Sequence, residues 1–310
     1  MDHADLGNPV TSRPVMTPVF RFAPSPTGFL HLGHALSAIC VWREAGAVGG
    51  KVLLRIEDID PQRSRPEHVE GIFEDLAWLG LSWDGEVRRQ SEHLDDYRAA
   101  LERLAAENLV YTCRLSRADI AAALTKAEGE TRAPWPRDPD GAPRLPIPGA
   151  GPNPEETREA VRLDMARALA ALGGETPTWR ELGSGPQGET GLVRVQPALW
   201  GDVILARKET PTSYHLAVTV DDALQGVTHV VRGQDMFHAT SVHRLLQRLL
   251  GLPEPVYRHH RLVSDDDGRK LAKSRGSPSL RSLRAQGWTR EDVLRAVDGL
   301  LQGGVLKSSA

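Results

Sequence analysis

Apolar residues along the chain follow two spacings, which predict short buried strands that alternate with amphipathic helices. Residues 19–22 and 51–56 are short, mostly apolar runs and predict two strands. Apolar residues recur every three or four positions from residue 31 onward, over residues 69–79 and over residues 97–107, and they predict three helices. Strands that alternate with helices are typical of an α/β fold with a doubly wound parallel sheet, whose ligand crevice lies at the carboxyl ends of the strands.

The later part of the chain departs from this alternation. Residues 129–154 are dense in Pro, Gly and Asp and predict an exposed loop or flexible insertion, residues 154–172 predict a helical segment, and the α/β pattern resumes near residue 193. An apolar stripe near the end predicts one or two amphipathic helices and consists of Leu280, Leu283, Val293, Leu294, Val297 and Leu300. We therefore divide the chain into a flexible N-terminal extension (1–18), a first half of the α/β fold (19–108), a connective insertion (109–195), a second half (196–277) and a C-terminal helical segment (278–310).

Composition is typical of a soluble intracellular protein. Of the 310 residues, 40% are hydrophobic and 25% are charged, which suffices for one large α/β domain. The two cysteines, Cys40 and Cys113, provide neither a disulfide framework nor a metal cluster. No apolar run is long enough to span a bilayer, and residues 1–18 lack the layout of a secretory signal. We therefore expect a cytoplasmic protein without membrane contact.

A turn rich in proline and glycine precedes the first predicted helix and is the first candidate for chemistry. Residues 24–34 read PSPTGFLHLGH, so the turn leads into a helix N-terminus, which favours an anion such as phosphate. His31 and His34 are three positions apart and should project toward the same spot, and Gly33 between them lets a ligand approach the backbone. Taken alone, two histidines at helical spacing are more often capping or surface residues.

A basic loop flanked by glycine near the other end of the chain is the second candidate. Residues 268–275 read GRKLAKSR and place Lys270 and Lys273 three positions apart. Such a run is by itself typical of a solvated surface, but two cations on a loop can also contact a triphosphate and follow its charge as pyrophosphate leaves. Both motifs together, in this order, favour a site that binds the phosphates of ATP.

Five separate motifs resemble the catalytic core of the glutamyl-tRNA synthetases, a family of class I aminoacyl-tRNA synthetases. They are residues 21–28 (RFAPSPTG), 55–60 (RIEDID), 214–217 (YHLA), 220–222 (VDD) and 226–233 (GVTHVVRG). The match spans roughly residues 19–290, and five motifs in order are far more specific than any one of them. The resemblance implies a Rossmann-type nucleotide-binding fold that binds L-glutamate and ATP, with Mg²⁺ on the triphosphate.

The same resemblance assigns roles to individual residues. ATP would be bound by Thr27, Gly28, His31, Gly33, His34, Lys270 and Lys273, of which His31, His34, Lys270 and Lys273 would be catalytic. Glutamate would be bound by Arg21, Ala23, Ser25, Glu57, Tyr214 and Arg232. Glu57 would contact its ammonium group and Arg232 its side-chain carboxylate, since a guanidinium fork matches a carboxylate. Without the resemblance, Glu57 would more simply be a helix cap or surface carboxylate, and Arg232 a member of a structural ion pair.

Two departures from the glutamyl-tRNA synthetases indicate a shortened paralogous family, the glutamyl-Q tRNA(Asp) synthetases. Only residues 279–310 follow the lysine loop, so we expect no anticodon-binding domain. Val218 stands where the longer enzymes usually carry an asparagine, and the change should weaken and reshape the glutamate pocket. The resemblance implies that the protein activates glutamate with ATP and transfers it to the queuosine base in the anticodon stem-loop of tRNA(Asp).

A third departure concerns zinc. Many members of these families bind zinc in the insertion through a Cys-x-Cys pair, a tyrosine and another cysteine, whereas this chain has Cys113, Leu115 and no later cysteine. One thiolate cannot make a tetrahedral structural site, so we expect no zinc and no other metal held by the protein alone.

Two alternatives stay open: a truncated glutamyl-tRNA synthetase that charges the 3′ end of tRNA, and a non-catalytic tRNA-binding relic of a synthetase. The net charge of −3 argues against indiscriminate nucleic-acid binding but does not exclude local basic patches. Basic residues cluster late in the chain, and we expect some of them to contact a phosphate backbone, although each alone fits a solvated surface. They are Arg258, His259, His260, Arg261, residues 269–275, Arg281 and Arg284.

Overall fold

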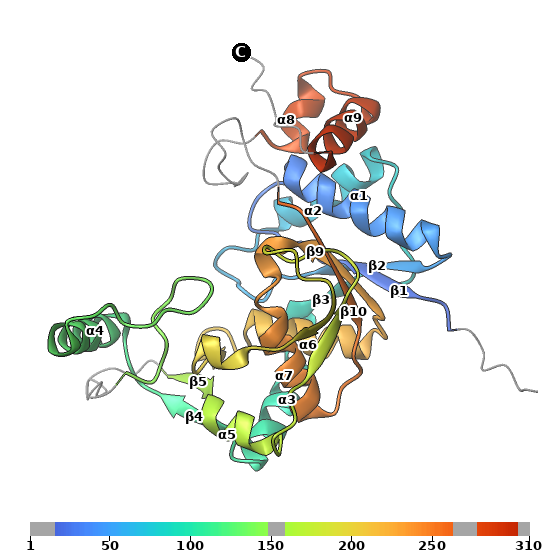
Figure 1. The fold of residues 1–310 in the computed structure, drawn as a ribbon. Helices are drawn as coiled ribbons and strands as arrows, with labels where there is room; N and C mark the ends of the chain where they lie inside the picture. The colour runs from blue at the N-terminus through green and yellow to red at the C-terminus, as the bar shows by residue number, and fades with distance from the viewer. Residues whose placement is uncertain (1–15, 148–158, 263–277, 303–310) are drawn as a thin grey trace, which may run out of the picture.

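The computed structural model describes residues 16–147, 159–262 and 278–302. A seven-stranded main sheet forms the centre of the molecule, and a three-stranded small sheet stands to one side of it (Figure 1). Among the described residues, no helix combines the length and the apolar character that a membrane span requires. The strands of the main sheet are, in spatial order, β3 (Arg88–Arg89), β2 (Lys51–Ile56), β1 (Val19–Phe22), β9 (His229–Gly233), β10 (Val256–His260), β6 (Thr178–Glu181) and β7 (Gly191–Arg194).

The strand order reverses direction at β1, as the doubly wound arrangement predicted from the sequence requires. The chain runs from β1 to β2 and β3 on one side and later to β9 and β10 on the other, with all these strands parallel. α1 (Leu32–Ala47) and α2 (Pro66–Trp78) cover one face of the sheet (Figure 1). α3 (Leu94–Ala106), α6 (Tyr214–Leu224) and α7 (Thr240–Leu250) pack together on the other face. A crevice is therefore expected at the carboxyl ends of β1 and β9.

Alternation along β9 decides which side chains face which helices. Val231 packs with Phe20 and Val52 beneath α1, whereas Val230 packs with Tyr257 on the opposite face. Because side chains two positions apart in a strand share a face, Arg232 joins Val230 on the face that α7 covers. The register places Arg232 directly beside His259 of β10.

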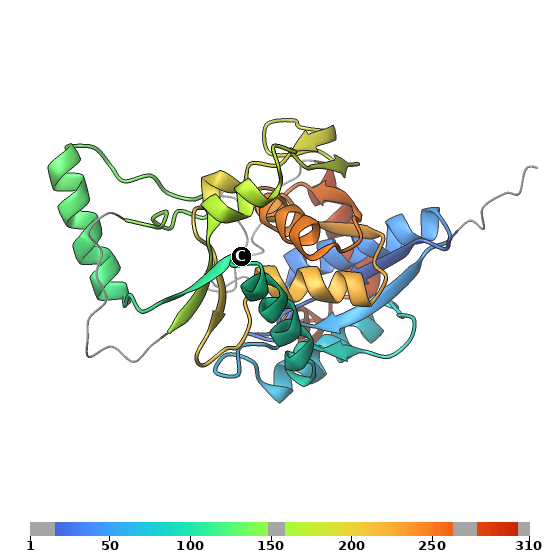
Figure 2. The ribbon, with the colours of Figure 1, turned by 90° about the horizontal axis from the view of Figure 1, so that it is seen from below.

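The small sheet has the order β4-β5-β8 and is antiparallel. Its strands are β4 (Val110–Cys113), β5 (Ala160–Leu163) and β8 (Ile204–Arg207). Two helices accompany it, α4 (Arg117–Thr131) and α5 (Met165–Ala171). Figure 1 and Figure 2 both show α4 standing away from the main sheet, so this part of the insertion is laterally attached to the catalytic core.

The helix predicted over residues 154–172 is only partly present in the structure. The prediction is wrong for residues 160–163. Residues Ala160–Leu163 form β5, and the helix is limited to Met165–Ala171. β5 pairs with β4 on one side and with β8 on the other, and these hydrogen bonds outweigh the local helical spacing. The Asp164 side chain then caps the helix by accepting the backbone N–H of Arg167 at 3.0 Å.

The strand pairing also cuts across the boundaries predicted from the sequence. β6 and β7 lie within the predicted insertion but join the main sheet through β10, whereas β8 lies in the predicted second half but belongs to the small sheet. The predicted exposed loop is partly wrong as well, because Leu145 and Ile147 are buried against Ala123 and Ala127 of α4. Pairing and burial depend on segments far apart in the chain, which local composition does not record.

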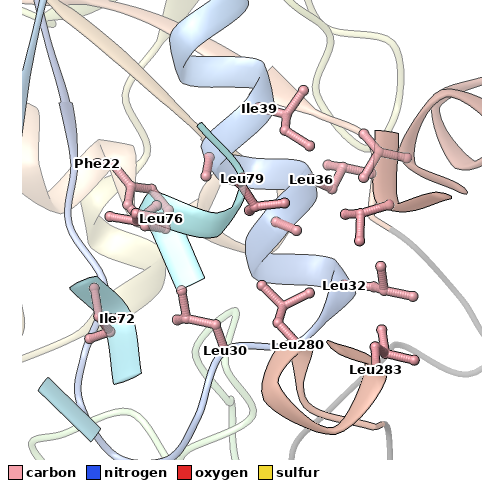
Figure 3. Packing of buried hydrophobic residues seen from close by; sticks show 14 of the residues in the cluster. Phe22, Leu30, Leu32, Leu36, Ile39, Ile72, Leu76, Leu79, Leu280 and Leu283 are labelled. Carbon is pink, nitrogen blue, oxygen red and sulfur yellow. The ribbon is translucent and has the colours of Figure 1, made fainter. Parts of the chain in front are cut away.

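The C-terminal segment, predicted to form one or two amphipathic helices, forms two, α8 (Leu280–Ala285) and α9 (Arg290–Leu301). Figure 3 shows Leu280 and Leu283 beside Leu32, near the start of α1. The predicted stripe is confirmed as part of one buried cluster, with Leu294 only partly buried. Burying each such side chain contributes about 1.5–3 kcal/mol, so the segment is held firmly on α1.

Candidate active site

A cavity of about 590 Å³ opens at the carboxyl ends of β1, β2, β9 and β10. Its walls come from the segments that follow these strands and from the starts of α1 and α6. They include most residues that the sequence singled out: Arg21, Ala23, Ser25, Thr27, His31, Gly33, His34, Glu57, Tyr214 and Arg232. Gly28 precedes α1 but does not line the cavity, and Lys270 and Lys273 lie outside the described residues.

His31 and His34 cap α1 and lie against each other at the cavity wall. The backbone N–H of Gly33 donates to Nδ1 of His31, and the backbone N–H of His31 donates to Nδ1 of His34, each at 3.1 Å. This reciprocal pair is a capping box, and the two ring centroids are 3.9 Å apart. Capping therefore places both imidazoles at a helix N-terminus, where a phosphate is favoured. Helix capping and phosphate binding, the two interpretations of these histidines, are therefore compatible.

The described chain resumes beside these histidines after the lysine loop. Ser279 forms a β-bridge with His31, and the backbone N–H of Leu280 donates to the carbonyl of Leu30 at 2.8 Å. Residues 268–275 themselves lie outside the described residues. The segment that follows the lysine motif is thus joined directly to the first histidine motif.

A buried ion-pair network supports one wall of the cavity. Asp222 of α6 accepts hydrogen bonds from Nε of Arg21 at 3.1 Å and from Arg55 at 2.8 Å, and Arg55 also donates to Glu57 at 3.3 Å. Burial raises the pKa of the Glu57 carboxyl, although Arg55 and Arg21 act in the opposite direction. Burial would also raise the pKa of Asp222, but Arg21 and Arg55 lower it below its usual value. A ligand ammonium group beside Glu57 would favour its charged form, so ammonium binding and ionisation are coupled.

Arg232 lies at another wall and is held by uncharged groups. Its Nε donates to Nε2 of His259 at 3.1 Å, and its two terminal nitrogens lie 3.2 Å from Nδ1 of His243 and 2.7 Å from the Thr240 hydroxyl. The guanidinium also faces the ring of Tyr257, 5.4 Å from its centroid. Within the described chain no carboxylate forms an ion pair with Arg232, which argues against a purely structural ion pair.

The charges on the cavity wall complement a dicarboxylic amino acid. Arg21 and Arg232 are cationic, whereas Glu57 is acidic, and all three are buried at the cavity wall. Burial raises the pKa of Tyr214, which keeps its hydroxyl neutral. Arg21 is already paired with Asp222, so the charges that match a ligand most directly are the Arg232 guanidinium, for a carboxylate, and Glu57, for an ammonium group. The helix N-terminus beside them adds an anion site.

Sequence reasoning missed the residues that stand behind these walls. Asp222 and Arg55 belong to motifs quoted for the resemblance, but their mutual pairing gave no local signal. Two adjacent acids in an otherwise apolar helix were an available sign of burial, and Asp221 is indeed fully buried, accepting hydrogen bonds from Arg88, Gln90 and Tyr97. His243 had no recognisable pattern at all. These roles depend on contacts between distant segments.

Some of the late basic residues that the structure describes are neutral or paired with acids. Burial and Arg232 lower the pKa of His259 to about 4, even though Glu181 acts in the opposite direction, so this side chain is neutral near pH 7. Arg258 pairs with Glu44 at 3.0 Å, and Arg284 pairs with Glu74 at 3.3 Å. Acids from distant segments thus offset charge that is contiguous in the sequence. Residues 269–275 lie outside the described residues.

A second cavity of about 740 Å³ adjoins the first, and Tyr214 lines both. Its walls come from the small sheet, α4 and the segment after β2. It combines charged side chains of both signs with an apolar and aromatic surface formed by Ile120, Leu124, Leu145 and Trp200. The charged residues are Arg63, Arg117, Arg162, Arg207, Asp60, Asp138, Asp140 and Asp202, and Arg63 pairs with Asp60 at 2.6 Å. Cationic groups beside apolar and aromatic surface suit a nucleic acid with an unstacked base.

Comparison with known proteins identifies the family. The model of the tRNA synthetases class I (E and Q), catalytic domain, matches residues 18–162 and 187–302. The chain belongs to this family. A class I synthetase catalytic core and a ligase of the aminoacyl-tRNA synthetase type, both predicted from the sequence, are therefore confirmed.

Individual relatives show which members of the family this chain resembles. The chain is 47% identical over 292 residues to the glutamyl-Q tRNA(Asp) synthetase of Rhodobacter capsulatus, covering 90% of this chain and 99% of that protein. It is 41% identical to the protein of the same name from Symbiobacterium thermophilum, covering 88% of this chain and 83% of that protein. The solved glutamate tRNA ligase of Elizabethkingia meningosepticum, in complex with its amino acid, has a TM-score of 0.65 and 26% identity. That match covers 88% of this chain and 54% of the ligase chain.

The donor set around Cys113 does not fit a structural zinc site. Cys113 is a buried free cysteine at the end of β4, and the described residues contain no group of three His, Cys, Asp or Glu side chains able to hold a metal. We expect elemental analysis of the purified synthetase to find no stoichiometric zinc, and chelator to leave its melting temperature unchanged. One zinc per chain, or a chelator-induced fall in melting temperature, would contradict this prediction.

Proposed function

We propose that this synthetase activates L-glutamate with ATP and transfers the glutamyl group to the queuosine base in the anticodon stem-loop of tRNA(Asp). The observation that carries the proposal is the cavity in which Arg21, Arg232 and Glu57 lie beside the N-terminus of α1. Two relatives, of which this chain covers 99% and 83%, carry the name glutamyl-Q tRNA(Asp) synthetase and support the choice of acceptor. Val218 is buried one helical turn after Tyr214 and does not line the cavity, so its effect on the pocket is indirect.

Activation follows from where charge develops. The α-carboxylate of glutamate attacks the α-phosphorus of ATP, the bond to pyrophosphate breaks, and negative charge grows on the phosphate oxygens. His31 and His34, together with Lys270 and Lys273, stabilise that charge more strongly than they stabilise the ground state. Thr27, Gly28 and Gly33 let the triphosphate approach the turn before α1 and its N-terminus.

Glutamate is held by groups that match its three charges. Glu57 binds the ammonium group, and Arg232 binds the side-chain carboxylate through its planar fork. Arg21, Ala23, Ser25 and Tyr214 orient the remaining part so that the α-carboxylate faces the triphosphate.

Mg²⁺ is expected to bind together with ATP. It is commonly held by substrate phosphates and water rather than by a protein cage. When bound, it offsets negative charge on the triphosphate.

Transfer requires the modified base to reach the adenylate. We place the anticodon loop over the second cavity, between the insertion and the core, where the exposed Arg117 and Arg207 can contact its backbone. A wobble base splayed out of its stack would then extend past Tyr214, which lines both cavities, toward the glutamyl carbonyl. A hydroxyl of the cyclopentenediol attacks this carbonyl, an ester forms and AMP leaves.

Three measurements test the proposal. Glutamate-dependent pyrophosphate exchange should occur with enzyme, ATP and Mg²⁺ before any tRNA is added, because the groups for both small substrates are present in the core. Glutamate should then be transferred to queuosine-containing tRNA(Asp), including tRNA whose 3′ adenosine has been removed. tRNA(Asp) from cells unable to make queuosine should accept none.

Each alternative function gives a different result. A truncated glutamyl-tRNA synthetase would glutamylate the queuosine-free tRNA and fail once the 3′ adenosine is missing. A non-catalytic relic would show no exchange under any condition. Either outcome would overturn the proposal.

A further inference from the structure

The hydrogen bonds around Arg232 fix the protons on three histidines. Nε2 of His259 accepts from Arg232, so the His259 proton lies on Nδ1, which is 2.6 Å from Oε2 of Glu181. Nδ1 of His243 accepts from Arg232, so its Nε2 donates to Nδ1 of His215 at 3.2 Å. Burial and Arg232 keep the pKa of all three imidazoles below the usual value, at about 4 for His215 and His259. The acceptors therefore hold the guanidinium without neutralising it.

Glu181 lies outside the cavity and determines the state of His259. Its Oε1 accepts the backbone N–H groups of Gly183 at 2.8 Å and of His259 at 2.9 Å. Its Oε2 accepts the indole N–H of Trp179 at 3.3 Å in addition to Nδ1 of His259. Burial would raise the Glu181 pKa, but its hydrogen bonds from His259 outweigh burial and lower it, so the buried carboxylate stays charged. Four donors thus hold one carboxylate in a single orientation.

The backbone also brings Glu181 close to His259. β6 pairs with β10 at Glu181 and Tyr257, two positions before His259. A side chain at Gly183 would collide with the carbonyl oxygen of His259, so only glycine lets the chain pass at this distance. Glu181 on β6, His259 on β10 and Arg232 on β9 therefore connect three neighbouring strands of the main sheet, and all three side chains are buried.

We propose that Glu181 is a positioning residue: through His259 it holds Arg232 ready for the side-chain carboxylate of glutamate and so favours glutamate over glutamine. If the His259 proton were on Nε2, that N–H would face the Nε–H of Arg232, and the guanidinium would lose an acceptor. The uncharged hydrogen-bond partners matter for selectivity, because a buried cation that no described carboxylate contacts gains more from a ligand carboxylate than from a neutral amide. The inference rests on the proposed function in assigning the side-chain carboxylate to Arg232.

The substitution Glu181→Gln reverses the proton on His259 with almost no change of shape. Two backbone N–H groups favour the amide oxygen at the Oε1 position, which turns the amide NH₂ toward Nδ1 of His259. His259 must then accept at Nδ1 and carry its proton on Nε2, facing Arg232. The amide NH₂ also faces the indole N–H of Trp179, so the variant loses that long 3.3 Å hydrogen bond in addition to reversing the His259 proton, and its melting temperature must be measured beside its KM values.

We expect Glu181→Gln to raise the KM for glutamate in pyrophosphate exchange by roughly 10- to 100-fold, the effect of one lost charge-assisted hydrogen bond. The KM for ATP should stay within about twofold, and the preference for glutamate over glutamine should fall by a similar factor to the rise in KM. The matched control is Glu254→Gln, which weakens a 2.5 Å ion pair with Arg244 on α7 but does not contact Arg232. Its KM for glutamate should not change.

A rescue experiment separates positioning from structural support. His259→Gln can place an amide oxygen near the position of Nε2, so it gives Arg232 an acceptor that does not depend on Glu181. In that background, Glu181→Gln should cause no further rise in the KM for glutamate. If Glu181→Gln alone does not fold, His259→Leu removes the acceptor directly and should raise the same KM.

The outcomes distinguish this inference from the proposed function. If the wild-type enzyme shows glutamate-dependent exchange and folded Glu181→Gln keeps its KM for glutamate, the positioning role is wrong while activation stands. An equal rise in the KM for glutamate and ATP would identify a structural role instead. A higher KM with unchanged discrimination against glutamine would overturn the assignment of Arg232 to the side-chain carboxylate. Absence of exchange in the wild type would contradict the proposed function itself.

Discussion

Replacing His34 with alanine is expected to slow glutamate-dependent pyrophosphate exchange by roughly 30- to 1,000-fold, equivalent to about 2–4 kcal/mol of transition-state stabilisation. The imidazole lies at the N-terminus of α1 beside His31, where the proposed mechanism places the negative charge that grows on the phosphates. The measurement is the exchange rate at saturating glutamate and ATP. Saturation is needed because the interaction should be stronger in the transition state than in the bound ground state.

The capping role that the sequence offered as an alternative is also present, because His34 caps the helix. Its Nδ1 accepts the backbone N–H of His31, so alanine should lower the free energy of unfolding by roughly 0.5–2 kcal/mol as well. His34→Gln is the matched control, since glutamine at this helix position can keep the capping hydrogen bond. Both variants should lose exchange activity, and only the alanine variant should lose stability. Full activity in His34→Gln would show that the imidazole has no role in activation.

Asp222→Asn is expected to lower the free energy of unfolding by about 3–5 kcal/mol, because it removes the anion from a buried ion-pair network. Asp222 neutralises both Arg21 and Arg55, and Arg55 is completely buried. Denaturant unfolding of the two proteins at pH 7 provides the measurement. The matched control is Asp298→Asn, which breaks the 2.5 Å pair with Arg43, both side chains being 47% exposed. An exposed pair of this kind contributes about 0–1 kcal/mol.

The effect of Asp222 should also depend on pH. Its pKa is lowered in the folded protein, so its stabilisation is fully present above the unfolded value of about 3.9 and is lost as pH falls through the folded pKa. The difference in stability between wild type and Asp222→Asn should therefore be constant near neutral pH and shrink below about pH 4. A loss no larger than that of Asp298→Asn, or a difference that grows in acid, would contradict the assigned role of the network.

Much of the candidate site could be predicted from local sequence because its elements are short and strongly patterned. The strands over residues 19–22 and 51–56 match β1 and β2 without a shift, and the turn before His31 leads into α1. The motifs that contain Arg21, Glu57 and Arg232 were identified by resemblance, and the structure gathers all three in one cavity. Their individual roles in binding glutamate stay predictions.

Local patterns failed where pairing partners decide the structure. Residues 160–163 have a helical spacing but form β5, since β4 and β8 supply hydrogen bonds on both sides. β6 lies in a stretch that composition assigned to the insertion, but it extends the main sheet beside β10. No window of neighbouring residues contains this information, because the partners lie tens of residues away.

The sequence by itself determined the alternation of strands and helices, the helix N-terminus that carries two histidines, and the apolar stripe that attaches the last two helices. These features follow from spacing and turn chemistry within a few residues. Only the tertiary structure decided which ionisable side chains are charged and which are neutral. His259 stands in a run of basic residues but becomes a neutral acceptor, because β6 supplies Glu181 and burial disfavours the imidazolium. Arg232 keeps its charge for a ligand because, among the described residues, its hydrogen-bond partners are all uncharged. Charge inside a protein is set by burial and by neighbours in space, and neither is a property of local sequence.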